Sequence, residues 1–172
     1  MDDTAFVHQM LTDLGTTFNI DPKRIYASGF SNGAEFAYRL ACEMSGTFAA
    51  VAPVAGILGF SPCQLQQPIS ILHVHGLADP TVAYKGGVDS ASGTKIPSVE
   101  ESIAAFVTLD GCPASPTVKV DSIVTHTVYA GCKNGTAVEL YTIKTGGHTW
   151  QNDAIPTNQI IWDFFASHPK QS

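Results

Sequence analysis

Short apolar runs alternate with amphipathic helical segments along much of the chain, and this alternation limits the fold more than any other feature. A 3.6-residue apolar period predicts helices over residues 2–18, 33–44, 98–109 and 158–166. Between the helices, residues 24–28, 48–54 and 69–74 are too short to be helical and are predicted to be strands, the last two of them buried. Strands that alternate with helices form parallel sheets. The sequence therefore predicts an α/β fold, with a mostly parallel sheet and helices on both faces.

The remaining segments complete this pattern. Residues 117–129 and 137–143 are predicted to be strands that pair antiparallel around a turn at 131–135. Residues 80–97 are rich in Gly and Ser and predict a surface loop, while Ser98 and Glu101 predict a capping box at the start of the next helix. No repeat or linker interrupts the 172 residues, so we expect a single domain over residues 1–172.

The distribution of charged and apolar residues disfavours two classes of partner, nucleic acid and membranes. The chain carries 9 basic and 15 acidic residues, and its net charge is −6. Its Lys and Arg are scattered singly, whereas nucleic-acid binding needs clusters of them. No apolar run approaches the roughly 20 residues that cross a bilayer. We therefore expect neither nucleic acid nor a membrane as a partner.

The four cysteines lack the C-x-x-C spacing of zinc and redox sites. An even count favours two disulfides and an exported protein, although buried free thiols are the alternative. Three pairings are open, and we favour the two sequential ones, Cys42 with Cys63 and Cys112 with Cys132. The first twenty residues are not a signal peptide. For a secreted protein, we expect the leader to have been removed or to lie upstream.

Residues 29–33 read Gly-Phe-Ser-Asn-Gly, a G-x-S-x-G element between a predicted strand and a predicted helix. This is the context of a nucleophile elbow, in which the serine is exposed at the end of the strand. The turn is tight, and we expect side chains at positions 29 and 33 to collide. The neighbouring helix N-terminus would stabilise an oxyanion, with the N–H of Asn32 as one donor. A Gly/Ser-rich turn without a catalytic role is the alternative.

A serine nucleophile needs a base and a carboxylate that orients the base. In elbow-type hydrolases the chain order is Ser, then Asp or Glu, then His. His148 follows a strand in a glycine-rich loop that can fold over Ser31, and Asp79 follows the strand at 69–75 at the same end of the sheet. The sequence therefore predicts Ser31 as nucleophile, His148 as base and Asp79 as acid. A turn-forming Asp-Pro pair is the alternative role for Asp79.

Four stretches together resemble the polyhydroxybutyrate depolymerase and feruloyl esterase-like family of α/β-hydrolases. They are residues 21–34, residues 48–56, the His-x-His-Gly-x-x-Asp run at 73–79, and Gly-Gly-His-Thr-Trp at 146–150. The resemblance covers nearly the whole chain in the right order. It implies a secreted serine carboxylesterase that needs no cofactor and acts on short acyl or aryl esters, or on esters of a polymer. Ser31, Asp79 and His148 match the family's triad positions.

The chain departs from the family pattern at its front. Such proteins have further strands before the first helix, including a turn that supplies a second oxyanion N–H. We therefore expect the chain to be the C-terminal part of a larger α/β-hydrolase fold. The strand near Ile25 to Ser28 would then expose an edge and favour a homo-oligomer. With one oxyanion donor missing, turnover would be about a hundredfold lower or worse.

Two aromatic residues, Trp150 and Tyr84, are candidates to line an acyl or aryl pocket, although plain packing is as common for aromatics at strand ends. Two other functions stay open. The chain could be a catalytically weak or inactive fragment that keeps the triad and binds carbohydrate or a partner. A metal-dependent hydrolase using His73, His75 and Asp79 is disfavoured, because no fourth ligand stands at metal spacing. We expect no metal.

Overall fold

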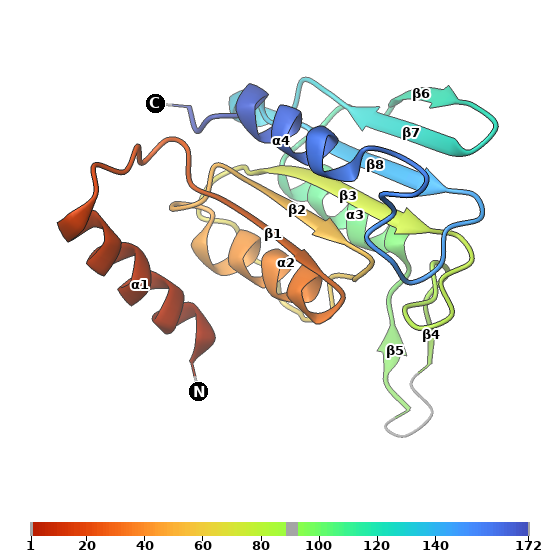
Figure 1. The fold of residues 1–172 in the computed structure, drawn as a ribbon, viewed down its shortest axis with the longest axis horizontal. Coiled ribbons are helices and arrows are strands. Elements are labelled where there is room, and N and C mark those ends of the chain that lie inside the picture. The colour runs from red at the N-terminus through yellow and green to blue at the C-terminus, as the bar shows by residue number, and fades with distance from the viewer. Residues whose placement is uncertain (1, 89–92, 172) are drawn as a thin grey trace.

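The computed structural model describes residues 2–88 and 93–171 of the chain. Within these ranges six strands form one sheet, shown in Figure 1. Their order across the sheet is β1 (Tyr26–Phe30), β2 (Ala50–Val54), β3 (Ser70–Gly76), β8 (Val138–Ile143), β7 (Val124–Tyr129) and β6 (Thr117–Val120). The first four strands run parallel, and β7 and β6 continue the sheet antiparallel. The mostly parallel α/β fold predicted from the sequence is confirmed.

Helices cover both faces of the sheet. On one face α2 (Asn32–Met44) packs on β1 and β2, and α3 (Val99–Leu109) packs on β3 and β8. On the other face α4 (Thr157–Ser167) lies across β2 and β3 (Figure 1). The predicted capping box of α3 is present, since Ser98 and Glu101 bond each other's backbone N–H.

Side chains alternate between two cores, as the period of a strand requires. Val51 and Ile71 join the core under α2 and α3, and their neighbours Ala52 and Leu72 join the core under α4. All residues of β2 and β3 are buried. This burial on both faces explains why β2 is a continuous apolar run, and why the polar side chains of β3, Ser70, His73 and His75, are buried as well.

The first helix, α1 (Asp3–Thr17), stands beside the rest of the molecule and packs against α2 (Figure 1). Asp2 caps it by accepting a hydrogen bond from the N–H of Ala5. Of its residues only Val7 is buried, and its apolar stripe is largely solvent-exposed, including Phe6, Met10 and Leu14.

Three segment predictions were wrong in detail. Residues 117–129 are a hairpin rather than one strand, because the carboxylate of Asp121 accepts hydrogen bonds from the N–H groups of Ile123 and Val124 and so closes a turn. The loop predicted at 80–97 contains the short antiparallel pair β4 (Gly87–Val88) and β5 (Lys95–Ile96). The part of that loop at 89–92 lies outside the described residues. The first strand also extends to Phe30, two residues beyond its predicted end.

Both predicted disulfides are present, Cys42 with Cys63 and Cys112 with Cys132. The first joins α2 to the segment between β2 and β3, and the second joins the end of α3 to the segment after β7.

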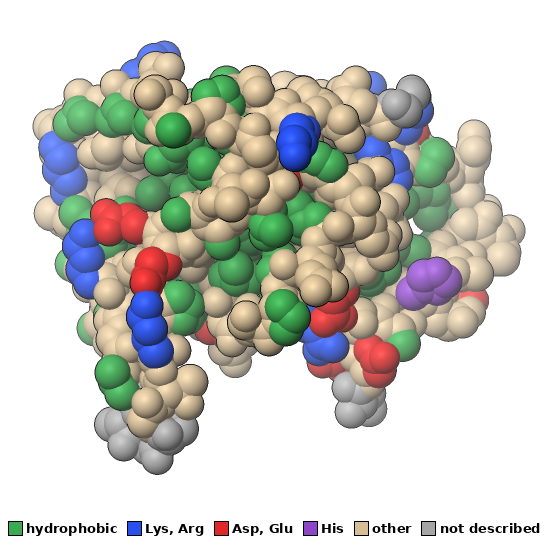
Figure 2. Space-filling view, turned by 180° about the vertical axis from the view of Figure 1, so that it is seen from behind, with side chains coloured by type: hydrophobic (Ala, Val, Ile, Leu, Met, Phe, Trp, Pro, Cys, Tyr) green, Lys and Arg blue, Asp and Glu red, His purple; other side chains and the backbone are tan. Residues whose placement is uncertain are grey.

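Figure 2 shows the face that carries α2 and α3: hydrophobic side chains gather over its middle, and charged side chains lie mainly towards its sides. Among the described residues, no helix combines the length and the apolarity that a membrane crossing requires.

Candidate active site

Ser31 lies in a sharp turn between β1 and α2. Its backbone has φ 57° and ψ −120°, a conformation that residues other than glycine rarely adopt. Three hydrogen bonds hold this conformation: the N–H of Ser31 donates to the carbonyl of Val54, and its carbonyl accepts from Ala34 and Glu35. Such strain persists only where the surrounding structure fixes it, and it is typical of a nucleophile elbow.

Glycine is required at one side of this turn and not at the other. A Cβ on Gly29 would overlap the carbonyl of Gly33, whereas a Cβ on Gly33 would meet nothing within 4 Å. The prediction that both flanking positions need glycine was therefore wrong for Gly33. A second steric requirement lies elsewhere, because a Cβ on Gly56 would come within 2.8 Å of the Ser31 carbonyl oxygen.

The structure brings the three predicted residues together in one hydrogen-bonded line. Nε2 of His148 lies 3.0 Å from Oγ of Ser31, and Nδ1 of the same ring lies 2.8 Å from Oδ2 of Asp79. Asp79 follows β3 and His148 follows β8, which are neighbours in the sheet. The carboxyl ends of parallel strands meet at one edge, and this is why residues so far apart in sequence converge.

The carboxylate of Asp79 is completely buried and well supplied with donors. Its Oδ1 accepts hydrogen bonds of 2.8 Å from the N–H groups of both Thr81 and Val82. Burial raises the pKa of this carboxyl group, but the bonds from His148, Val82 and Thr81 outweigh burial, and the pKa is lowered overall. Asp79 is therefore ionised at neutral pH and can only accept from His148.

The turns that carry Asp79 and His148 are joined through their backbones. A Cβ on Gly76, the last residue of β3, would overlap the carbonyl of Gly146. The same carbonyl accepts a hydrogen bond of 3.0 Å from Ala78, and the carbonyl of Ile143 accepts one of 2.9 Å from Leu77. Backbone contacts therefore set the spacing between acid and base.

Asn32 is the first residue of α2, next to Ser31. The first N–H groups of a helix have no acceptor within the helix, and the helix dipole makes this end positive. The arrangement suits the predicted role of the Asn32 N–H as an oxyanion donor.

One aromatic ring borders the histidine, and a second lies next to the first. The ring of Phe30 lies 4.8 Å from that of His148, and the ring of Trp150 lies 6.5 Å from Phe30. The Trp150 indole donates a 2.6 Å bond to Oδ1 of Asn158. Phe30 was missed in the sequence, although its place directly before the serine was the signal that could have found it.

Tyr84 does not lie with these residues. Its side chain is only 5% exposed, its hydroxyl bonds to Thr142, and its ring packs edge-on against His75 in the core. The structure thus places Tyr84 in a packing role, the alternative that was open for it.

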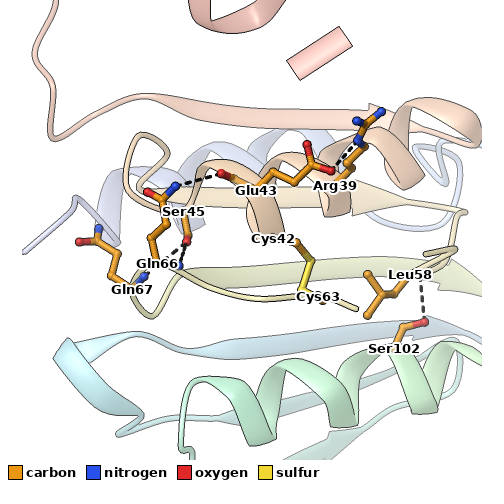
Figure 3. Close-up of a disulfide and its surroundings, with 9 residues drawn as sticks. All are labelled: Arg39, Cys42, Glu43, Ser45, Leu58, Cys63, Gln66, Gln67 and Ser102. Atoms are coloured by element: carbon orange, nitrogen blue, oxygen red, sulfur yellow. Dashed lines mark hydrogen bonds and ion pairs between the residues drawn. A yellow bond between two sulfur atoms is a disulfide. The ribbon is translucent and has the colours of Figure 1, made fainter. Parts of the chain in front are cut away.

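An open cavity of about 460 Å³ begins at Asn32 and includes Glu35, Phe36 and Phe60. Gly59 and Phe60 also border a larger cavity of about 790 Å³ that extends along α3. Figure 3 shows what holds the segment that carries these two residues: the Cys42–Cys63 disulfide ties it to α2, and its Leu58 N–H donates to Oγ of Ser102 on α3. On the other side, Ser28, Trp150 and Trp162 line a cavity of about 410 Å³.

The described residues contain no group of three or more His, Cys, Asp or Glu side chains arranged to hold a metal ion. Nε2 of His73 and Nδ1 of His75 lie 3.0 Å apart and are hydrogen-bonded to each other.

The sheet order and the serine turn define the class: the chain has the α/β-hydrolase fold. It superposes on an acetyl xylan esterase from Aspergillus awamori with a TM-score of 0.66 and 15% identity, over 94% of this chain and 66% of that one. A thermostable esterase superposes with a TM-score of 0.63 and 18% identity, over 99% of this chain and 37% of that one.

Sequence comparison narrows the class and confirms the resemblance to feruloyl esterases. The chain is 29% identical over 171 residues to feruloyl esterase B of Piromyces equi, covering 95% of this chain and 31% of the relative. It is 32% identical over 179 residues to the putative esterase NocK of Nocardia uniformis subsp. tsuyamanensis, covering 92% of this chain and 52% of the relative. This chain therefore spans between about a third and about half of these relatives. No family model matches the sequence.

Proposed function

We propose that the chain is a serine carboxylesterase in which Ser31, His148 and Asp79 are the nucleophile, base and acid. The observation that carries the proposal is the hydrogen-bonded line from Oγ of Ser31 through the His148 ring to Oδ2 of Asp79. The named esterases among its relatives, feruloyl and acetylxylan esterases included, support the same reaction class.

The geometry suggests the following steps. Oγ of Ser31 attacks the ester carbonyl while Nε2 of His148 takes its proton, and Asp79 stabilises the imidazolium that forms. The N–H of Asn32 donates to the oxyanion. His148 then gives the proton to the leaving alcohol, and an acyl group remains on Ser31. Water, activated by the same ring, releases the acid and restores the serine.

The surroundings suggest which esters fit. Phe30 offers an aromatic face beside the histidine and Trp150 lies next to Phe30, and the cavity at Phe60 continues into the larger one along α3. We infer that short acyl or aryl esters, feruloyl and acetyl esters among them, occupy this space. Disulfides form in oxidising compartments. Both disulfides therefore fit a secreted protein.

The test compares the wild type with Ser31→Ala on p-nitrophenyl esters from acetate to octanoate and on methyl ferulate. Loss of the nucleophile should reduce kcat by at least about a thousandfold. Ser28→Ala, which removes a serine hydroxyl from β1, the strand directly before Ser31, is the matched control and should stay active. Stoichiometric labelling of Ser31 by a fluorophosphonate should accompany activity. Ester hydrolysis that survives Ser31→Ala would refute the proposal.

A further inference from the structure

A second line of hydrogen bonds leads to Asp79 from the opposite side. The hydroxyl of Tyr38, in the middle of α2, lies 2.9 Å from Nδ1 of His73. Nε2 of His73 lies 3.0 Å from Nδ1 of His75, and Nε2 of His75 lies 2.9 Å from the carbonyl oxygen of Val82. All three side chains are fully buried and their rings stack in sequence. The triad itself does not use this line.

The protons in the line have only one arrangement when both imidazoles are neutral. A carbonyl can only accept, so Nε2 of His75 carries a proton and its Nδ1 accepts. His73 must then donate from Nε2, and its bare Nδ1 accepts from the hydroxyl of Tyr38. Burial lowers the pKa of both histidines, most strongly that of His73, and so favours the neutral forms. Every donor in the line therefore points towards the turn of Asp79.

The last donor holds the turn that carries the acid. Both backbone groups of Val82 are hydrogen-bonded: its N–H donates to Oδ1 of Asp79, and its carbonyl accepts from Nε2 of His75. Nε2 of His75 also lies 3.5 Å from Oδ2 of Asp79, the oxygen that accepts from His148. His75 is thus in contact with both the turn and the carboxylate that it presents.

We propose that His75 is a positioning residue for Asp79, and that Tyr38 and His73 fix the tautomer in which it acts. The inference rests on the proposed function, because it assigns His75 a part in orienting the acid of that triad. An acid held in this way keeps the His148 ring aligned with Ser31 through the reaction.

The first experiment needs no turnover. Long-range ¹⁵N–¹H NMR of the labelled protein should show His73 and His75 as neutral Nε2–H tautomers, with assignments from His73→Gln and His75→Gln. An imidazolium or an Nδ1–H tautomer at either residue would overturn the proposed donor-to-acceptor order from Tyr38 to Val82. The proton between His148 and Asp79 should give a low-field resonance in the wild type. His75→Leu should lose this resonance, and its survival there unchanged would overturn the positioning role.

The second experiment measures whether substitution of His75 changes kcat or KM. His75→Leu should reduce kcat about tenfold to a hundredfold with little change in KM, the usual cost of an orienting partner. His75→Gln, which keeps a donor that can reach Val82, should recover most of the rate. His126→Leu removes a strand histidine that pairs with Glu139 instead, and it should leave kcat unchanged.

A double-mutant cycle separates positioning from general stability. If His75 acts through Asp79, His75→Leu should add almost no further loss of fluorophosphonate labelling rate in an Asp79→Asn background. Equal losses in both backgrounds would reject the inference. Failure of the proposed function would give a different result, because the wild type would then show no Ser31-dependent hydrolysis. The NMR experiment would still test the hydrogen bonds between Tyr38, His73 and His75.

Discussion

Asp110 is a carboxyl group that the proposed reaction does not use, and its burial makes its protonation depend on pH near neutrality. It lies at the end of α3 with no exposed surface. Its Oδ1 accepts from the N–H of Ile69, and its Oδ2 is buried without a hydrogen-bond partner in the described structure. Burial raises its pKa to about 7, against the bond from Ile69, which lowers it.

This raised pKa predicts a loss of stability towards alkaline pH. The folded protein keeps the Asp110 proton at pH values where the unfolded chain, with a pKa near 3.8, has released it. Its stabilising contribution is therefore complete below about pH 4 and disappears as the pH rises through 7. At 1.36 kcal/mol per pKa unit the total change is about 4 kcal/mol.

Asp110→Asn mimics the protonated form and should remove this dependence. Urea unfolding should give nearly equal free energies for variant and wild type at pH 4, and a more stable variant at pH 8. Asp153→Asn, at an exposed position, serves as the control. A difference that does not change between pH 4 and pH 8 would contradict the raised pKa.

Among the elements, β1 is the edge of the sheet, as the sequence predicted for this strand. The carbonyl of Ile25 accepts from Ala49 and the N–H of Ser31 donates to Val54, so these odd-numbered residues turn towards β2. Even-numbered residues such as Ser28 turn their N–H and C=O groups to the outer edge. An unpaired edge of this kind favours pairing with another chain.

We expect the chain to associate through β1 at micromolar concentration, as sedimentation velocity would show. Ser28→Pro removes one outward N–H without removing a β1–β2 hydrogen bond, and it should shift the protein towards the monomer. Ser28→Ala loses only the hydroxyl that donates to the carbonyl of Ala52, and it should associate like the wild type. A wild-type monomer with β1 solvated would contradict the expectation.

The elements also show how far the sequence could predict the fold. β2, β3 and the helices followed from apolar periodicity, because burial dictates their composition. The hairpin at 117–129 did not, since both strands have the same β-forming composition and the turn depends on the side chain of Asp121. At the site, Ser31, Asp79 and His148 could be placed because strand ends converge. The core position of Tyr84 could not, because it depends on how the loop after Asp79 folds back on β3.

At the scale of the whole molecule, the two disulfides close loops of similar length, so their effects on stability and on catalysis can be compared. They join residues 21 and 20 positions apart, so each should stabilise the fold by about 3 kcal/mol. Only Cys42–Cys63 ties down the segment beside the cavity at Asn32 and Phe60.

Replacing either pair by serine should therefore lower Tm by a similar amount, with different effects on catalysis. The Cys42→Ser/Cys63→Ser variant should show a KM for aryl esters raised several-fold, because the cavity wall loosens. The Cys112→Ser/Cys132→Ser variant should keep the wild-type KM. Equal KM values in the two variants would show that the cavity does not bind the ester.

The contact between Gly76 and Gly146 also determines which segments of this fold can be replaced in engineered variants without moving the acid and the base. Main-chain contacts space the two turns that carry acid and base, whereas the cavity walls include residues from segment 58–63 together with Trp150 and Asn158. Libraries or chimaeras that replace those walls should keep the acid–base distance. β3 with residues 77–82 and β8 with residues 144–149 and Gln151 form one unit, which has to be transplanted together.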